Sequence, residues 1–143
     1  MRLTLIGALA LAALPAMAQK VITADVLVTD IAPLQDIRWQ RAQQHSPKYP
    51  LAMAKAGAQG CAVVSFNIDK NGKPGDIDIK QAVPAKAVSR STRRLVKELE
   101  YVATTADTTP QQRTIRIDYC IEDGVSELSV EQQCLQRTQY TCG

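Results

Sequence analysis

An Asn-Gly pair at positions 71 and 72 most narrowly limits how this chain can fold. Both residue types tolerate the positive φ angles that the tight turn of a β-hairpin requires. Residues 61–69 precede the pair, and their alternate side chains share one apolar face: Ala62, Val64, Phe66 and Ile68. Residues 76–82 follow the pair and carry isoleucine at alternate positions. This period of two predicts an antiparallel hairpin.

The pattern changes to a helical period after Pro84. Residues spaced by four and three positions form one stripe, which predicts an amphipathic helix over about 86–102; they are Val88, Thr92, Leu95, Leu99 and Val102. A third alternating strand is expected over 113–121, and Pro50 suits the start of a short helix over 51–56. The fold class is therefore α+β. It combines a three-stranded antiparallel sheet with one long helix on one face, a ββαβ core.

Residues 19–46 form an N-terminal extension to this core. Alternating side chains over 22–28 allow a short strand, and residues 36–45 are compatible with a short polar helix. Trp39 has a large apolar body, and we expect it to pack rather than to bind a ligand.

Residues 123–143 form a polar C-terminal tail. Ser129 and Gln132 have the spacing of a capping box, which predicts a short helix over 130–137. A helix of this length is marginal by itself, so we expect a disulfide to hold the tail.

Residues 1–18 have the build of a cleavable signal peptide. Arg2 gives a positive start, an apolar run follows, and the segment ends in Ala-Met-Ala. A spanning helix needs about 20 apolar residues, so we favour cleavage over the alternative of a retained membrane anchor. Loss of Arg2 lowers the formal charge from +3 to +2, which argues against a nucleic-acid partner. We expect a periplasmic protein with no transmembrane segment after cleavage.

All four cysteines lie beyond this leader: Cys61, Cys120, Cys134 and Cys142. An even number in a small exported domain is typical of two disulfides, and four cysteines allow three pairings. Zinc ligands usually come in close pairs, whereas this chain has no Cys-x-x-Cys and a single histidine. We therefore expect neither a metal site nor another cofactor.

Several short pieces follow one another in a fixed order over residues 47–122. They are Tyr49-Pro50 with an alanine-rich turn, Gly60, Val64-Ser65-Phe66-Asn67-Ile68-Asp69, Asn71-Gly72, the Ile77/Ile79 strand and Leu99-Glu100-Tyr101-Val102. In this order and spacing they resemble the C-terminal domain of the TonB family. Family members that transduce energy have a membrane anchor and a proline-rich spacer. We expect this chain to have neither. The resemblance therefore supports the fold more strongly than energy transduction.

The resemblance implies that the third strand lies at a sheet edge and accepts an extended strand from a protein partner. An edge strand offers unpaired N–H and C=O groups for such pairing. The residues expected to bind the partner are Arg113, Thr114, Ile115, Arg116, Ile117 and Asp118. The alternative is that Arg116 and Asp118 only protect the edge against aggregation.

The family's arrangement also implies a disulfide pairing. It places the third strand antiparallel beside the first, and strand parity puts Cys61 and Cys120 on the sheet face away from the helix. We therefore expect a Cys61–Cys120 bridge, which leaves Cys134–Cys142 to close a small loop in the tail.

A basic cluster lies off the apolar stripe of the long helix: Arg90, Arg93, Arg94 and Lys97. It would suit contact with an anionic surface or an acidic partner, but a solvated helix face is the alternative. His45 is the only imidazole, and nothing in the sequence places a nucleophile beside a base. We therefore expect no enzyme.

The sequence thus predicts a periplasmic protein-interaction module of the TonB C-terminal-domain type. The expected partner is an outer-membrane receptor segment or a component of an envelope complex, contacted by strand addition at the third strand. Two alternatives remain open. The chain would be a structural subunit of an envelope complex, or a short energy transducer if the leader stays in the membrane.

Overall fold

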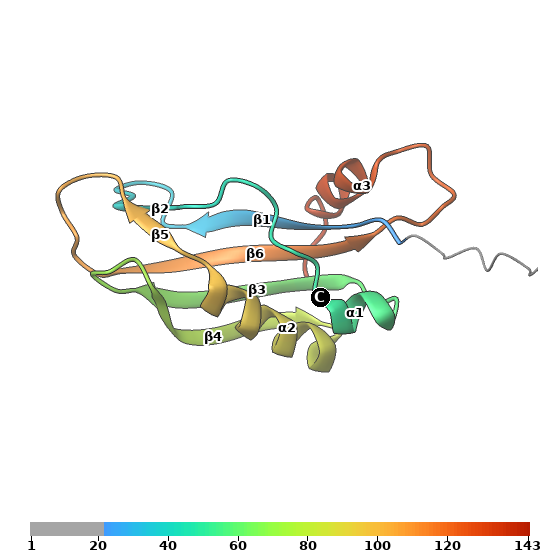
Figure 1. The fold of residues 1–143 in the computed structure, drawn as a ribbon, viewed down its shortest axis with the longest axis horizontal. Coiled ribbons are helices and arrows are strands. Elements are labelled where there is room, and N and C mark those ends of the chain that lie inside the picture. The colour runs from blue at the N-terminus through green and yellow to red at the C-terminus, as the bar shows by residue number, and fades with distance from the viewer. Residues whose placement is uncertain (1–21) are drawn as a thin grey trace, which may run out of the picture.

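Four antiparallel strands form the main sheet of the computed structural model, which describes residues 22–143. Their spatial order is β1-β6-β3-β4 (Figure 1). The strands span Ala24–Ala32 (β1), Gly60–Ile68 (β3), Pro74–Val83 (β4) and Gln111–Ile121 (β6). The α+β class is confirmed, but the sheet has four strands rather than three. The predicted signal peptide, 1–18, lies outside the described residues.

Helices cover both faces of this sheet (Figure 1). They are α1 (Leu51–Lys55), α2 (Ala85–Glu98) and α3 (Val130–Arg137). Helix α2 packs on β4 and β3, whereas α3 packs on β1 and β6 from the opposite face. The capping box at Ser129 and Gln132 is confirmed, because each side chain bonds the backbone N–H of the other residue.

A second, two-stranded sheet joins the N-terminal extension to the end of α2. It pairs β2 (Trp39–Arg41) with β5 (Tyr101–Ala103). The expected polar helix over 36–45 is therefore wrong, and the long helix ends at Glu98 because Leu99 is extended. Trp39 is 3 % exposed and donates its indole N–H to the Thr109 carbonyl at 3.1 Å, so its expected packing is confirmed. Burial of the Trp39 ring favours the pairing of β2 with β5 over the polar, solvent-exposed helix that the sequence suggested.

The core lies between the sheet and α2. Alternate residues of β3 and β6 face it, and the hydrophobic stripe of α2 covers them from the other side. The fully buried members from the strands are Ala62, Val64, Phe66, Ile68, Ile115, Ile117 and Tyr119. Met53 of α1 and Val26 of β1 complete this layer, so the sequence elements before β3 also contribute to the core.

Gly72 fixes the hairpin between β3 and β4. Its φ is +78°, and a Cβ atom there would lie 2.0 Å from the carbonyl oxygen of Tyr101. The Tyr101 N–H in turn donates to the Gly72 carbonyl at 3.0 Å. The turn is longer than the two-residue turn that the sequence suggested, and Asn71 does not have a positive φ. The Asp69 carboxylate accepts hydrogen bonds from the backbone N–H groups of Asn71 and Lys73, and this stabilises the longer turn. The turn thus serves both the hairpin and the second sheet.

Replacing Gly72 with alanine should lower the free energy of unfolding by at least about 2 kcal/mol. The new Cβ would add left-handed backbone strain and a clash with the Tyr101 carbonyl. Gly75→Ala is the matched control, because a Cβ there meets nothing within 4 Å, and its effect should be within about 0.5 kcal/mol. Urea unfolding of both variants checks this, and equal losses would contradict the assigned contact.

Two disulfides tie the C-terminal tail to the sheet, so the presence of two bridges is confirmed. They join Cys61 to Cys142 and Cys120 to Cys134, with Cα–Cα distances of 5.8 and 5.6 Å. The expected Cys61–Cys120 and Cys134–Cys142 pairing is therefore wrong. The parity argument holds, but the register places Asp118 opposite Cys61. Cys120 lies one step further, at a diagonal separation of roughly 7–8 Å, beyond the usual reach of a disulfide.

Peptide mapping without reduction should recover Cys61 linked to Cys142 and Cys120 linked to Cys134. The double variant Cys120→Ser/Cys134→Ser should lose about 3 kcal/mol of unfolding free energy on the chain-entropy account, since it opens a loop of 14 residues. A peptide containing Cys61 and Cys120 would contradict the register of β3 and β6.

Candidate functional site

Strand β6 lies inside the sheet, with a partner strand on each side over residues 114–119. It pairs with β3 on one side over residues 111–119 and with β1 on the other over residues 114–121. The prediction that this strand lies at the edge is therefore wrong. The sequence did not predict the internal position of β6. The alternating residues of the N-terminal extension indicated a strand, but they did not indicate which strand it pairs with.

The side chains expected to bind a partner are mostly buried. Arg113, Ile115 and Ile117 point into the core layer and are at most 1 % exposed. Thr114 lies on the other face, where its hydroxyl is 2.8 Å from that of Ser65. None of these four side chains lies exposed along a free edge.

Arg116 and Asp118 form an ion pair that supports the tail. The Arg116 Nε and Nη2 groups each donate to an Asp118 carboxylate oxygen at 2.8 Å. Asp118 is only 1 % exposed, and Arg116 also donates to the carbonyls of Arg137 at 3.1 Å and of Tyr140 at 2.5 Å. The proposed role in edge protection is wrong, because these charges hold the segment after α3 against the sheet.

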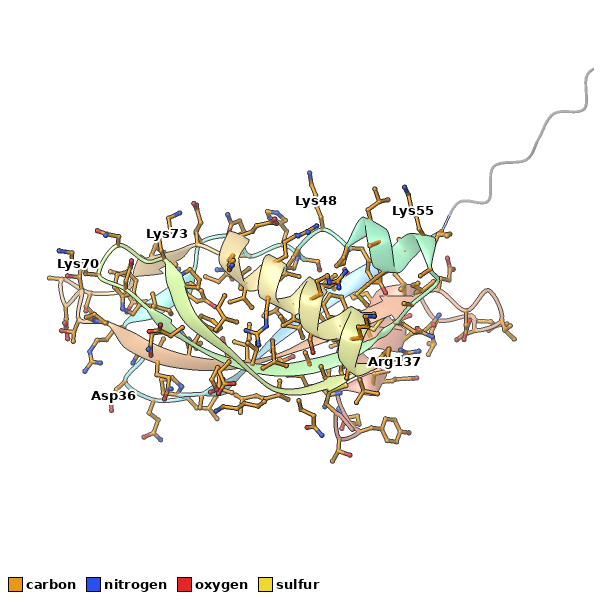
Figure 2. The ribbon with its side chains drawn as sticks, turned by 90° about the horizontal axis from the view of Figure 1, so that it is seen from below. Asp36, Lys48, Lys55, Lys70, Lys73 and Arg137 are labelled. Atoms are coloured by element: carbon orange, nitrogen blue, oxygen red, sulfur yellow. A yellow bond between two sulfur atoms is a disulfide. The ribbon has the colours of Figure 1, made fainter. Side chains whose placement is uncertain are left out.

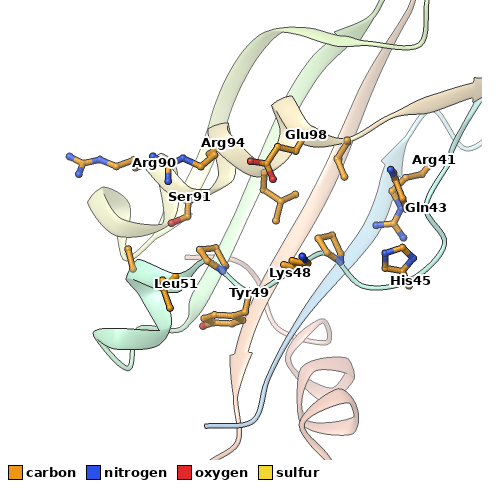
Figure 3. Close-up of a pocket in the computed structure, with 15 residues that line it drawn as sticks. Arg41, Gln43, His45, Lys48, Tyr49, Leu51, Arg90, Ser91, Arg94 and Glu98 are labelled. Carbon is orange, nitrogen blue, oxygen red and sulfur yellow. The ribbon is translucent and has the colours of Figure 1, made fainter. Parts of the chain in front are cut away.

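A groove lies between α2 and the segment that leads into α1 (Figure 3). Its volume is about 550 Å³. Its apolar lining consists of Pro47, Tyr49, Pro50, Leu51, Ala52, Leu95 and Leu99. Leu51 is 68 % exposed, so an apolar side chain stands open to solvent at the mouth of the groove.

Tyr49 gives the groove a rigid wall. Its hydroxyl donates to the Ala58 carbonyl at 2.5 Å, and its ring meets Tyr119 edge-on with centroids 6.0 Å apart. Burial raises the pKa of Tyr49 to about 12, so the phenol stays neutral at physiological pH. The wall therefore adds shape and no charge.

Basic side chains surround this groove (Figure 3). Four cations line it against a single carboxylate, Glu98; they are Arg41, Lys48, Arg90 and Arg94. The structure thus divides the predicted basic cluster. Arg93 instead donates to the Ile77 carbonyl of β4 at 2.7 Å, and Lys97 does not line the groove. Sequence reasoning missed Arg41 and Lys48, which only the fold brings beside α2.

Lysines also lie at the β3–β4 hairpin and along the chain that leads into α1. Figure 2 shows Lys70 and Lys73 at the hairpin, Lys55 on α1 and Lys48 on the segment that leads into α1. Lys73 is paired with Glu100 at 2.5 Å, whereas Lys48 lies beside the groove.

His45 lines the same groove and is exposed, with no nucleophile bonded to it. Within residues 22–143, no three side chains of the types His, Cys, Asp and Glu are arranged to hold a metal ion. The four cations and one carboxylate that line this groove suit recognition of an anion.

Residues 45–121 match the family described as the Gram-negative bacterial TonB protein C-terminal. The chain belongs to this family. It is also similar to a solved structure, the solution NMR structure of the Pseudomonas aeruginosa TonB CTD. The identity is 20 %, the TM-score is 0.41, and the match covers 62 % of this chain and 87 % of that one. None of the curated proteins matches the sequence.

The matched part of this TonB C-terminal domain leaves out both β1 and α3. These two elements are the ones that pack on the outer side of β6 and on the sheet face opposite α2. The elements outside the family match thus remove the edge that the resemblance implied. Among residues 22–143, no helix has the length and apolar character to span a membrane.

Amide hydrogen exchange should distinguish an internal β6 from an edge strand. In an internal strand, successive N–H groups bond alternately to the two neighbours, so every amide from Thr114 to Tyr119 should exchange slowly. Strand β4 is the control, since its outer edge is unpaired and alternate amides should exchange fast. Alternating fast exchange in β6, measured by NMR, would contradict its pairing with β1.

Proposed function

We propose that this TonB C-terminal domain is a periplasmic protein-interaction module linked to outer-membrane transport. The family match over residues 45–121 supports the class of function. The observation that carries the binding mode is the basic groove beside α2, because it combines open apolar surface with uncompensated positive charge.

The proposed occupant of the groove is an acidic, extended segment of a protein partner. Carboxylates of such a segment would meet Arg90, Arg94 and Lys48, while an apolar side chain would cover Leu51. Opposite charges steer such an encounter and fix its register. The partner segment would lie beside α2, since β1 already occupies the outer side of β6.

The partner belongs to one of two classes, an outer-membrane receptor segment or a component of an envelope complex. Both would present their acidic segment to the same groove. A photo-crosslinking residue at Ser91, which lines the groove, should capture this segment in cells, and mass spectrometry of the adduct would identify its class.

Charge reversal at the groove should weaken the partner's binding by at least about tenfold. Arg90→Glu with Arg94→Glu replaces two attractive contacts by repulsive ones. The matched control is Lys86→Glu with Lys97→Glu, which makes the same change in charge on exposed positions of α2 outside the groove. Crosslinking yield and binding of the identified segment measure both.

Three results would count against the proposal. The two pairs of substitutions would lower binding equally, the Ser91 position would give no adduct, or the captured segment would carry no acidic residues. Circular dichroism of each variant confirms that the fold is retained.

A further inference from the structure

Arg113 is a charged residue placed inside the core layer. It shares the inward parity of Ile115 and Ile117 on β6 and is 1 % exposed. Its Nη2 group donates to the Trp39 carbonyl, but its Nε and Nη1 groups are buried without a hydrogen-bond partner. Leaving charged N–H groups unpaired in the protein interior is costly.

A second arginine near Arg113 also has a buried nitrogen without a hydrogen-bond partner. The Nη1 group of Arg41 is also buried without a partner. Arg41 and Arg113 together line a cavity of about 310 Å³, which shares only Arg41 with the groove described above. Its other walls come from β1, β2 and β5 and from the loops beside them, and include Asp30, Gln44 and Tyr101.

The charges that face this cavity do not balance. Asp30 is the only carboxylate that lines it, and its Oδ1 is 3.6 Å from Arg113 Nη1, too far for a hydrogen bond. The Asp30 side chain is 55 % exposed, so much of it remains in water. The Tyr101 ring lies 5.8 Å from the Arg113 guanidinium, and burial raises the Tyr101 pKa to about 12, so this phenol adds no charge. Two guanidinium groups thus face one carboxylate.

We propose that this cavity binds a carboxylate, whose negative charge pairs with the guanidinium groups of Arg113 and Arg41 that line it. One added negative charge balances the two guanidinium groups together with Asp30. Hydrogen bonds between charged groups are the strong ones, and a guanidinium matches a carboxylate well. The cavity volume fits a small organic acid or the side-chain carboxylate of a peptide.

The test follows the side-chain Nε–H resonances of Arg113 and Arg41 by NMR in the chain without its leader. Acetate supplies a free carboxylate, and N-acetyl-glutamate amide supplies one in a peptide setting; sodium chloride at equal ionic strength is the reference. We expect a saturable shift of the Arg113 Nε–H resonance with acetate or with the glutamate derivative. The relative affinities tell which source fits the cavity.

Asp30→Asn is the sharpest variant, because it removes the resident negative charge. It should tighten carboxylate binding about tenfold, since like charges at this range repel. Arg41→Gln should weaken binding by a similar factor. Arg94→Gln is the control, because it removes the same charge from the groove and does not line the cavity.

Two outcomes would overturn the proposal. The Arg113 resonance would stay unchanged with both carboxylates, which would leave a buried water as the partner of these groups. Alternatively, Asp30→Asn would lower the thermal midpoint without gaining any carboxylate response, which would make Asp30 the complete partner of Arg113. Neither Asp30 nor Arg113 lines the groove, so this result is independent of the partner proposed there.

Discussion

The pairing of β6 with strands on both sides is the constraint on which the rest of this structure depends. It places one set of alternating residues against α2 and the other set beneath α3. Because side chains alternate strictly along a strand, a change of one residue in register would exchange these two sets. The core, the support of the tail and the burial of Arg113 all follow from this pairing.

Both ends of the described chain are attached to this central pair of strands. The N-terminal extension adds β1 to β6, and the tail is held through Cys120–Cys134 and Cys61–Cys142. Arg116 and Asp118 support the same attachment from the outer face of the sheet. Arg116 and Asp118 were expected to protect a free strand edge against aggregation. In this structure they stabilise the attachment of the tail to the sheet instead.

The covering of β6 also changes where we propose that the protein binds its partner. The family match covers the hairpin, α2 and β6, whereas the added elements remove the free edge of β6. Positive side chains outnumber negative ones at the groove beside α2 and at the smaller cavity at Arg113. Both suit carboxylates, and they are built from different side chains apart from Arg41. We propose that this TonB C-terminal domain, whose β6 is paired with β1, recognises anions at these two surfaces instead.

Local pattern was sufficient wherever one element's own residues decide its structure. The alternation in β3 and β6, the helical stripe that became α2 and the Ser129 capping box were all readable, because each signal lies within a few residues. The helix expected over 36–45 failed for the opposite reason. Its residues form β2 only because β5, some 60 residues further along, supplies the partner strand and the cover for Trp39.

The sequence by itself thus determined the fold class, the two disulfides and the family resemblance, since composition and short-range spacing carry them. Only the tertiary structure decided the pairing of the cysteines, the covering of β6 and the meeting of Arg41 with Arg113. Each of these depends on the register between segments far apart in the chain. Cys61 lies opposite Asp118, two residues before Cys120, so the two cysteines are not neighbours across the sheet. Strand parity predicts which face a side chain lies on, but it does not predict this register.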